Sequence, residues 1–142
     1  MSAVLRVFGD DLAIKKFLGG SKLIPIAVFQ RGEPRSPASR PNGSKHKRTG
    51  ANFSASDASM SDFRQQLKQA TAFLRDFASE IRSLRAYPGV EGMSLDFGVE
   101  TNPPHWASFG FPADLVAAAG ELKINLVVSV FPAEKAVDSS DW

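Results

Sequence analysis

The segment GMSLDFGVE, residues 92–100, alternates apolar and polar side chains with a period of two. In a β-strand this period sends successive side chains to opposite faces of the sheet. A strand with one apolar face belongs to a sheet that packs on helices on one side only. One face would carry Met93, Leu95, Phe97 and Val99, and the other Ser94, Asp96, Gly98 and Glu100. The sequence therefore predicts a sheet whose second face meets solvent or a partner.

A second long pattern starts at Phe63 and has the period of an α-helix. Its apolar residues recur in alternating steps of four and three: Phe63, Leu67, Ala70, Leu74, Phe77, Ile81 and Leu84. They line one side of a helix of about six turns, which Pro88 and Gly89 end. The spacing fits a helix lying on a sheet, and it also fits the seam of a coiled-coil dimer. We favour the helix on the sheet, because about three heptads are the lower limit for a coiled coil.

Shorter patterns complete the order of elements. Apolar and β-branched runs predict strands at 4–8, 25–30, 52–55 and 123–131, and helical patterns predict short helices at 10–18 and 113–120. This order favours an α+β fold, a two-layer sandwich in which a mainly antiparallel sheet carries one long and two short helices on one face. A ferredoxin-like variant is the specific arrangement that we expect.

The length and composition of the chain fit one folded domain. A chain of 142 residues with 43% hydrophobic and 23% charged residues is typical of a globular domain with its own core. We expect a single α+β domain at 1–132, which includes a basic loop at 31–50, and an acidic C-terminal tail at 133–142. Cysteine is absent, which excludes disulfides and slightly favours a cytoplasmic location. The apolar runs are too short to span a bilayer, so we expect no membrane association.

The basic loop, RGEPRSPASRPNGSKHKRTG, concentrates positive charge in a chain of net charge +2. The loop has one acidic residue, Glu33. Its six cations are Arg31, Arg35, Arg40, Lys45, Lys47 and Arg48. The segment could bind the phosphates of a nucleic acid, contact a protein or remain a solvated loop. It has no aromatic side chain to stack on bases before Thr49, and prolines and Gly43 interrupt it. We favour the solvated loop, followed by a protein contact and then by nucleic-acid binding.

Candidate catalytic and metal-binding residues are few. The two histidines, His46 and His105, lie in different loops and lack the spacing of metal ligands. Asp96 and Glu100 share one face of a strand at a spacing of about 13 Å, which is too long for the carboxylate pair of a glycosidase. The sequence contains no nucleophile elbow and no phosphate-binding loop. We therefore expect no catalytic residue, no metal and no cofactor.

One alternative is a small-ligand or enzyme site beside the loop NPPHWASFGF, residues 102–111. There His105 could act as a base and Trp106 as a stacking wall, with Asp96 and Glu100 lining the same hollow. In the simpler interpretation Trp106 covers the core and His105 is exposed. We favour the simpler interpretation.

Four segments together carry a resemblance to a known family: VLRVFGDD (4–11), VFQRGEP (28–34), GANFSAS (50–56) and FGFPADLVAAAGELKINLVVSVFP (109–132). They resemble a small bacterial family catalogued as a domain of unknown function, family 4279. The resemblance covers nearly the whole chain. It implies a strand with a short helix, then a long helix, and then a closing helix with an apolar strand. The family has no established activity, so the resemblance implies no catalytic residue.

These observations favour a non-enzymatic protein-interaction module of a bacterial cell, comparable to an immunity or accessory protein. The identity of the protein partner and the oligomeric state stay open. The alternatives are a nucleic-acid-binding accessory protein that uses the basic loop, and the small-ligand site at 102–111. The residues that we expect to take part in an interaction are Arg31, Arg35, Arg40, Lys45, Lys47, Arg48, Asp96, Glu100, His105 and Trp106.

Overall fold

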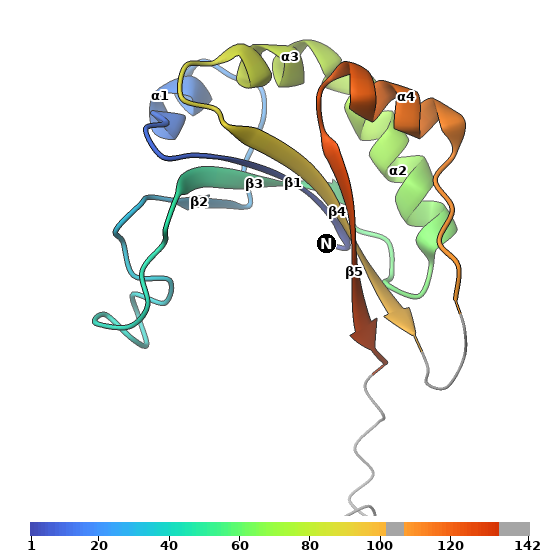
Figure 1. Cartoon of the computed structure of the whole chain (residues 1–142), viewed down its shortest axis with the longest axis horizontal. Coiled ribbons are helices and arrows are strands. Elements are labelled where there is room, and N and C mark those ends of the chain that lie inside the picture. The colour runs from blue at the N-terminus through green and yellow to red at the C-terminus, as the bar shows by residue number, and fades with distance from the viewer. Residues whose placement is uncertain (102–106, 134–142) are drawn as a thin grey trace, which may run out of the picture.

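The protein is described by a computed structural model over residues 1–101 and 107–133. Within these ranges it has the predicted α+β fold, with helices on one side of a five-stranded sheet (Figure 1). The elements in chain order are β1 (Ala3–Gly9), α1 (Ile14–Gly19), β2 (Ala27–Phe29), β3 (Thr49–Ser56), α2 (Phe63–Asp76), α3 (Ala78–Ala86), β4 (Gly92–Thr101), α4 (Ala113–Glu121) and β5 (Asn125–Pro132).

The strands lie in the order β2-β3-β1-β4-β5, and all neighbours are antiparallel except β4 and β5. The connection from β1 through α1 to β2 leaves one position free between the two strands, and β3 fills it. Because β4 then pairs with the other side of β1, the first four strands have the ferredoxin-like arrangement. The helix α4 adds β5 parallel to β4, which makes the sheet a five-stranded variant.

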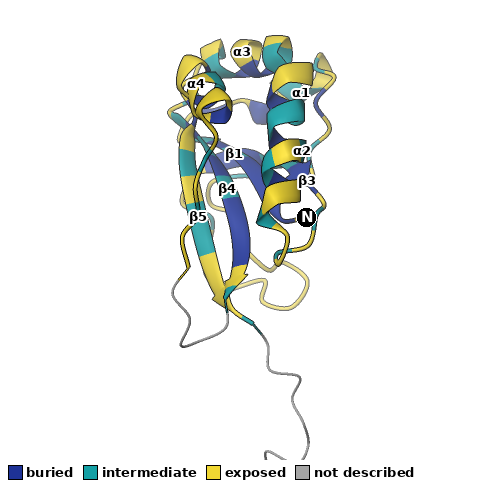
Figure 2. Ribbon diagram, turned by 90° about the vertical axis from the view of Figure 1, so that its right-hand side faces the viewer, coloured by how far each residue is buried: buried dark blue, intermediate teal, exposed yellow. Residues whose placement is uncertain are grey.

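The core lies between the helices and the covered face of the sheet (Figure 2). As the period of two predicts, Met93, Leu95, Phe97 and Val99 of β4 are each at most 1% exposed. The central strands β1 and β3 contribute alternate residues to the same face, and the helices close it. The largest fully buried side chains of these neighbouring elements are Phe53, Leu5, Ile14, Leu74, Ile81, Leu84 and Leu115.

The predicted long helix is two helices in the structure, because the chain changes direction at Phe77 (Figure 1). Phe77 has φ −111° and ψ 19°, and its amide still donates to the Phe73 carbonyl at 3.0 Å. The apolar seam continues across the break onto the same core, where Leu74, Ile81 and Leu84 are at most 1% exposed. The coiled-coil alternative is therefore wrong, since the sheet already covers the residues of the seam.

The start of α2 is fixed by two polar side chains. Asp62 caps the helix by accepting a hydrogen bond from the Gln65 amide at 3.1 Å. Gln66 is completely buried, and its Nε2 donates to the carbonyl of Gly98 at 2.8 Å and to that of Ser59 at 3.2 Å. The amide of Gln66 therefore ties the first turn of α2 to β4.

Candidate functional site

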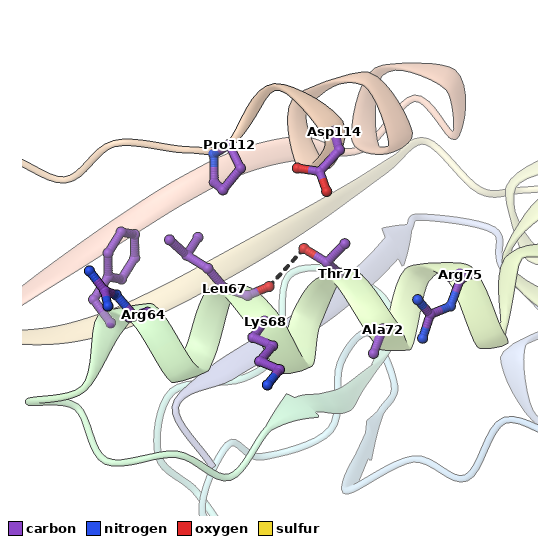
Figure 3. A pocket seen from close by; sticks show the side chains of 9 residues that line it. Arg64, Leu67, Lys68, Thr71, Ala72, Arg75, Pro112 and Asp114 are labelled. Carbon is purple, nitrogen blue, oxygen red and sulfur yellow. Dashed lines mark hydrogen bonds between the residues drawn. The ribbon is translucent and has the colours of Figure 1, made fainter.

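A groove between α2 and α4 has a volume of about 640 Å³ (Figure 3). Leu67 and Thr71 of α2 point toward α4, and Pro112 and Asp114 face them from the start of α4. Lys68 projects from the outer side of α2. The lining residues are Phe63, Arg64, Leu67, Lys68, Thr71, Ala72, Arg75, Pro112 and Asp114.

The apolar end of this groove is held by a cluster of phenylalanines. The ring centroid of Phe63 lies 5.8 Å from that of Phe97, 5.3 Å from that of Phe109 and 5.8 Å from that of Phe111. Each pair is close to perpendicular, which is a favourable geometry for aromatic side chains. Because Phe97 is fully buried in the core, the cluster fixes Phe63 as a rigid part of the groove.

Cations on α2 give the groove a positive edge. Arg64, Lys68 and Arg75 are exposed and spaced four and seven residues apart, so they share one side of the helix. In the described part of the chain, no carboxylate lies within ion-pair distance of Arg64 or Lys68. Arg75 contacts Asp76 at 3.3 Å, but both side chains are more than 60% exposed and the pair is weak.

The groove continues toward α3. A second hollow of about 240 Å³ shares Thr71 and Arg75 with the first and ends between α3 and α4. At that end, Arg82 contacts Glu121 at 3.4 Å. The apolar lining therefore extends along α2 far enough to accept a segment several residues long.

The basic loop of the sequence forms a narrow hairpin, here called the basic arm (31–48), which hangs from the sheet away from the helices (Figure 1). Three backbone hydrogen bonds of 2.9 Å join its two sides: Gly32 to His46, His46 to Glu33, and Arg35 to Ser44. An isolated bridge pairs Pro34 with Lys45. At the tip, the amide of Arg40 donates to the Ser36 carbonyl and that of Gly43 to the Arg40 carbonyl. These hydrogen bonds hold the backbone of the arm, and all six cations predicted to interact are exposed.

The base of the basic arm packs on the uncovered face of the sheet. The ring of His46 stacks on Phe29 at 5.1 Å, and the guanidinium of Arg48 lies 4.6 Å above the ring of Phe8. Both phenylalanine rings lie over glycines of the neighbouring strand. A Cβ at Gly50 would come within 2.8 Å of the Phe29 ring, and one at Gly92 within 2.5 Å of the Phe8 ring. These glycines leave the space in which the rings anchor the arm.

Replacing the tip of the basic arm, residues 36–43, with a short Gly/Ser turn should change the free energy of unfolding by less than about 1 kcal/mol. The tip has no buried residue, and the contacts at Phe29 and Phe8 lie outside the deleted segment. Thermal unfolding of the variant beside the full chain measures the effect. A fall in the midpoint of more than about 10 °C would show that the tip stabilises the body of the protein.

The predicted residue Asp96 lies on the uncovered face of the sheet, in a polar row across four strands. Its Oδ1 accepts a hydrogen bond from the Ser129 hydroxyl at 2.7 Å, and its Oδ2 lies 3.7 Å from Arg6. The amide of Asn52, turned so that its oxygen faces Arg6, accepts from that guanidinium at 3.1 Å. A hollow of about 220 Å³ lies over this row. Asp96 therefore has a structural partner of opposite charge.

The structure does not gather the predicted interaction residues into one site. Glu100 is exposed near the end of β4, four residues beyond Asp96, and the six cations lie on the basic arm. His105 and Trp106, on which the small-ligand alternative depends, lie outside the described residues. Across residues 1–101 and 107–133, no three carboxylate or imidazole groups come close enough to hold a metal ion. No helix within these ranges is long and apolar enough to cross a membrane.

Sequence reasoning missed the groove. The signal in the sequence was the spacing of Arg64, Lys68 and Arg75 on the polar side of the predicted helix, a pattern that is also typical of a solvated surface. Comparison of the chain with family models, with curated proteins and with solved structures finds no match. The resemblance to the family of unknown function therefore stays a prediction, and no residue role comes from a relative.

Proposed function

We propose that the chain is a non-enzymatic protein-interaction module, which binds an acidic segment with apolar side chains in the groove between α2 and α4. The observation that supports this most directly is the pairing of an apolar lining, Phe63 and Leu67, with the adjacent cations Arg64 and Lys68. An apolar surface beside cations is complementary to a ligand that has both apolar and acidic side chains.

The apolar lining and the cations would contribute in different ways. Burial of Phe63 and Leu67, both partly exposed in the free protein, would supply most of the affinity through the hydrophobic effect. The cations would orient the segment and speed its association, because exposed charges act mainly on steering and specificity. The rigid phenylalanine cluster keeps the groove formed before binding, which lowers the entropic cost of association.

A designed helical peptide tests the proposal, because helices that occupy grooves present apolar anchors at positions i, i+4 and i+7. The peptide carries leucines at these positions, glutamates on one flank and a fluorescent label. We expect it to bind the protein, and we expect the Arg64→Glu, Lys68→Glu double variant to bind it at least about tenfold more weakly. Fluorescence anisotropy measures both affinities.

Two matched controls make this test specific. A peptide with lysines in place of the glutamates should recover affinity for the double variant, because the charges then match again. The variant Arg35→Glu, Arg40→Glu carries the same charge change on the basic arm and should bind the acidic peptide as the natural protein does. Equal loss of binding in both variants, or no binding of the acidic peptide to the natural protein, would refute the groove as the site.

A further inference from the structure

The basic arm carries a separate concentration of charge that the groove does not use. Its six cations are exposed, and within the described ranges no carboxylate lies at ion-pair distance from any of them. The hairpin hydrogen bonds fix the backbone that displays them, and the contacts of His46 and Arg48 fix its base. Ordered cations without a carboxylate partner are an electrostatic site for an anionic ligand. We propose that the basic arm binds duplex DNA through its phosphates.

The chemistry of the arm favours nucleic acid over an acidic protein. Protein interfaces depend on apolar and aromatic anchors, whereas between 33 and 48 the arm offers only Ala38, the prolines and His46, whose ring already stacks on Phe29. A contact built from charge alone suits a polymer with one negative charge in about every 1.7 Å of duplex length. The groove has the opposite character, since its lining is apolar.

The shape of the arm favours a duplex over a single strand. Single-strand sites stack bases on free aromatic rings, but the one ring of the arm, His46, already stacks on Phe29. A two-stranded ribbon fits the major groove of B-form DNA, and that of A-form RNA is too narrow. The hydrogen-bonded part of the arm, 32–35 with 44–46, is a short two-stranded segment of this kind.

The arrangement of side chains in the hairpin also fits a groove with phosphates on both walls. The bridge places Lys45 opposite Pro34, so these two side chains share one face of the ribbon. Arg35 is the next residue after Pro34, and its amide donates to the Ser44 carbonyl at 2.9 Å, so the alternation of a two-stranded segment places it on the other face. The tip residue Arg40 lies beyond both. Cations on both faces can reach the phosphates of both strands.

The DNA site goes beyond the protein-binding function proposed above and does not depend on it. The basic arm hangs below the sheet, on the side away from the helices that form the groove (Figure 1). Substitutions in one region therefore leave the other region intact.

Fluorescence anisotropy with a labelled duplex of about 20 base pairs tests the proposal at ~50 mM salt, where phosphate contacts are strong. We expect binding whose log affinity falls with log salt at a slope of about −5, as six phosphate contacts predict. The variant Arg35→Gln, Arg40→Gln, Lys45→Gln should lose three contacts, which lowers affinity at least tenfold and reduces the slope to about −3. The variant Arg64→Gln, Lys68→Gln, Arg75→Gln removes three charges from α2, so it is the matched control and should bind DNA unchanged.

Two further ligands decide the chemical class, namely the labelled single strand of the same sequence and a polyglutamate of similar charge. Both should bind more weakly than the duplex. Tighter binding of the single strand than of the duplex would refute the duplex as the ligand. Binding of polyglutamate as tight as that of the duplex would refute nucleic acid as the class of ligand. Absence of duplex binding, or an equal loss in the arm variant and the groove variant, would refute the arm as the site. None of these outcomes bears on peptide binding in the groove.

Discussion

Substituting Phe97 with alanine should lower the free energy of unfolding by about 3–5 kcal/mol. Phe97 is fully buried at the centre of β4, and its ring lies 5.3 Å from that of Phe111 and 5.8 Å from that of Phe63. Alanine would leave a cavity beneath both rings, because the rigid sheet and α2 can collapse only partly around it. A loss of this size is a large share of the stability of an ordinary domain, about 5–15 kcal/mol.

Phe131→Ala is the matched control for this experiment. Phe131 lies on β5 at the edge of the sheet and is 47% exposed, so its truncation should cost less than about 1 kcal/mol. Urea unfolding of both variants and of the natural protein gives the two losses. Similar losses in Phe97→Ala and Phe131→Ala would contradict the view that the phenylalanine cluster holds the core and the floor of the groove.

The one-sided sheet could be predicted because the alternation of apolar and polar residues along a strand shows which of its faces is buried. Met93, Leu95 and Phe97 face the helices as the alternation requires. The weak pattern around Asn52 also marks a true strand, β3, which extends from Thr49 to Ser56 because its pairing with β1 stabilises residues of low strand propensity. Tertiary pairing thus lengthens an element that local sequence only indicates.

The break between α2 and α3 could not be predicted from the chain. Neither proline nor glycine stands near Phe77, and the apolar spacing of three and four residues continues from Leu74 to Ile81. The direction of the two helices depends on the sheet beneath them, which no local pattern describes. The parallel pairing of β5 with β4 is similarly set by the path of α4.

The candidate sites differ in how much of them the sequence displays. The cations of the basic arm are adjacent in the chain, so their concentration is visible in the sequence, whereas the hairpin that orders them depends on hydrogen bonds between 31–35 and 44–48. The groove requires α4 to lie beside α2. Until Pro112 and Asp114 are placed opposite Leu67, the cations of α2 cannot be told from an ordinary solvated face.

Gln66→Glu should destabilise the protein by about 3–4 kcal/mol at pH 7 and by much less at pH 4. The natural amide donates to the carbonyls of Gly98 and Ser59 from a completely buried position. An ionised carboxylate there would face two acceptors without water. Burial therefore raises the pKa of the introduced carboxyl above its unfolded value of about 4.3.

The sign of the pH dependence follows from this raised pKa. Below about pH 4.3 the introduced carboxyl is protonated in both the folded and unfolded states, and it can still donate one hydrogen bond. As the pH rises, the unfolded chain releases the proton and the folded chain retains it, so stability is lost progressively until the folded pKa is reached.

Gln66→Leu is the control, because it leaves the same carbonyls without a donor but introduces no charge, at a cost of about 1–3 kcal/mol. Urea unfolding of the three proteins from pH 4 to 8 separates the loss of the hydrogen bonds from the cost of the buried charge. The glutamate variant should become less stable than the leucine variant as the pH increases. A constant difference between the two variants across this range would mean that water reaches position 66 and that the contact between α2 and β4 is not a dry one.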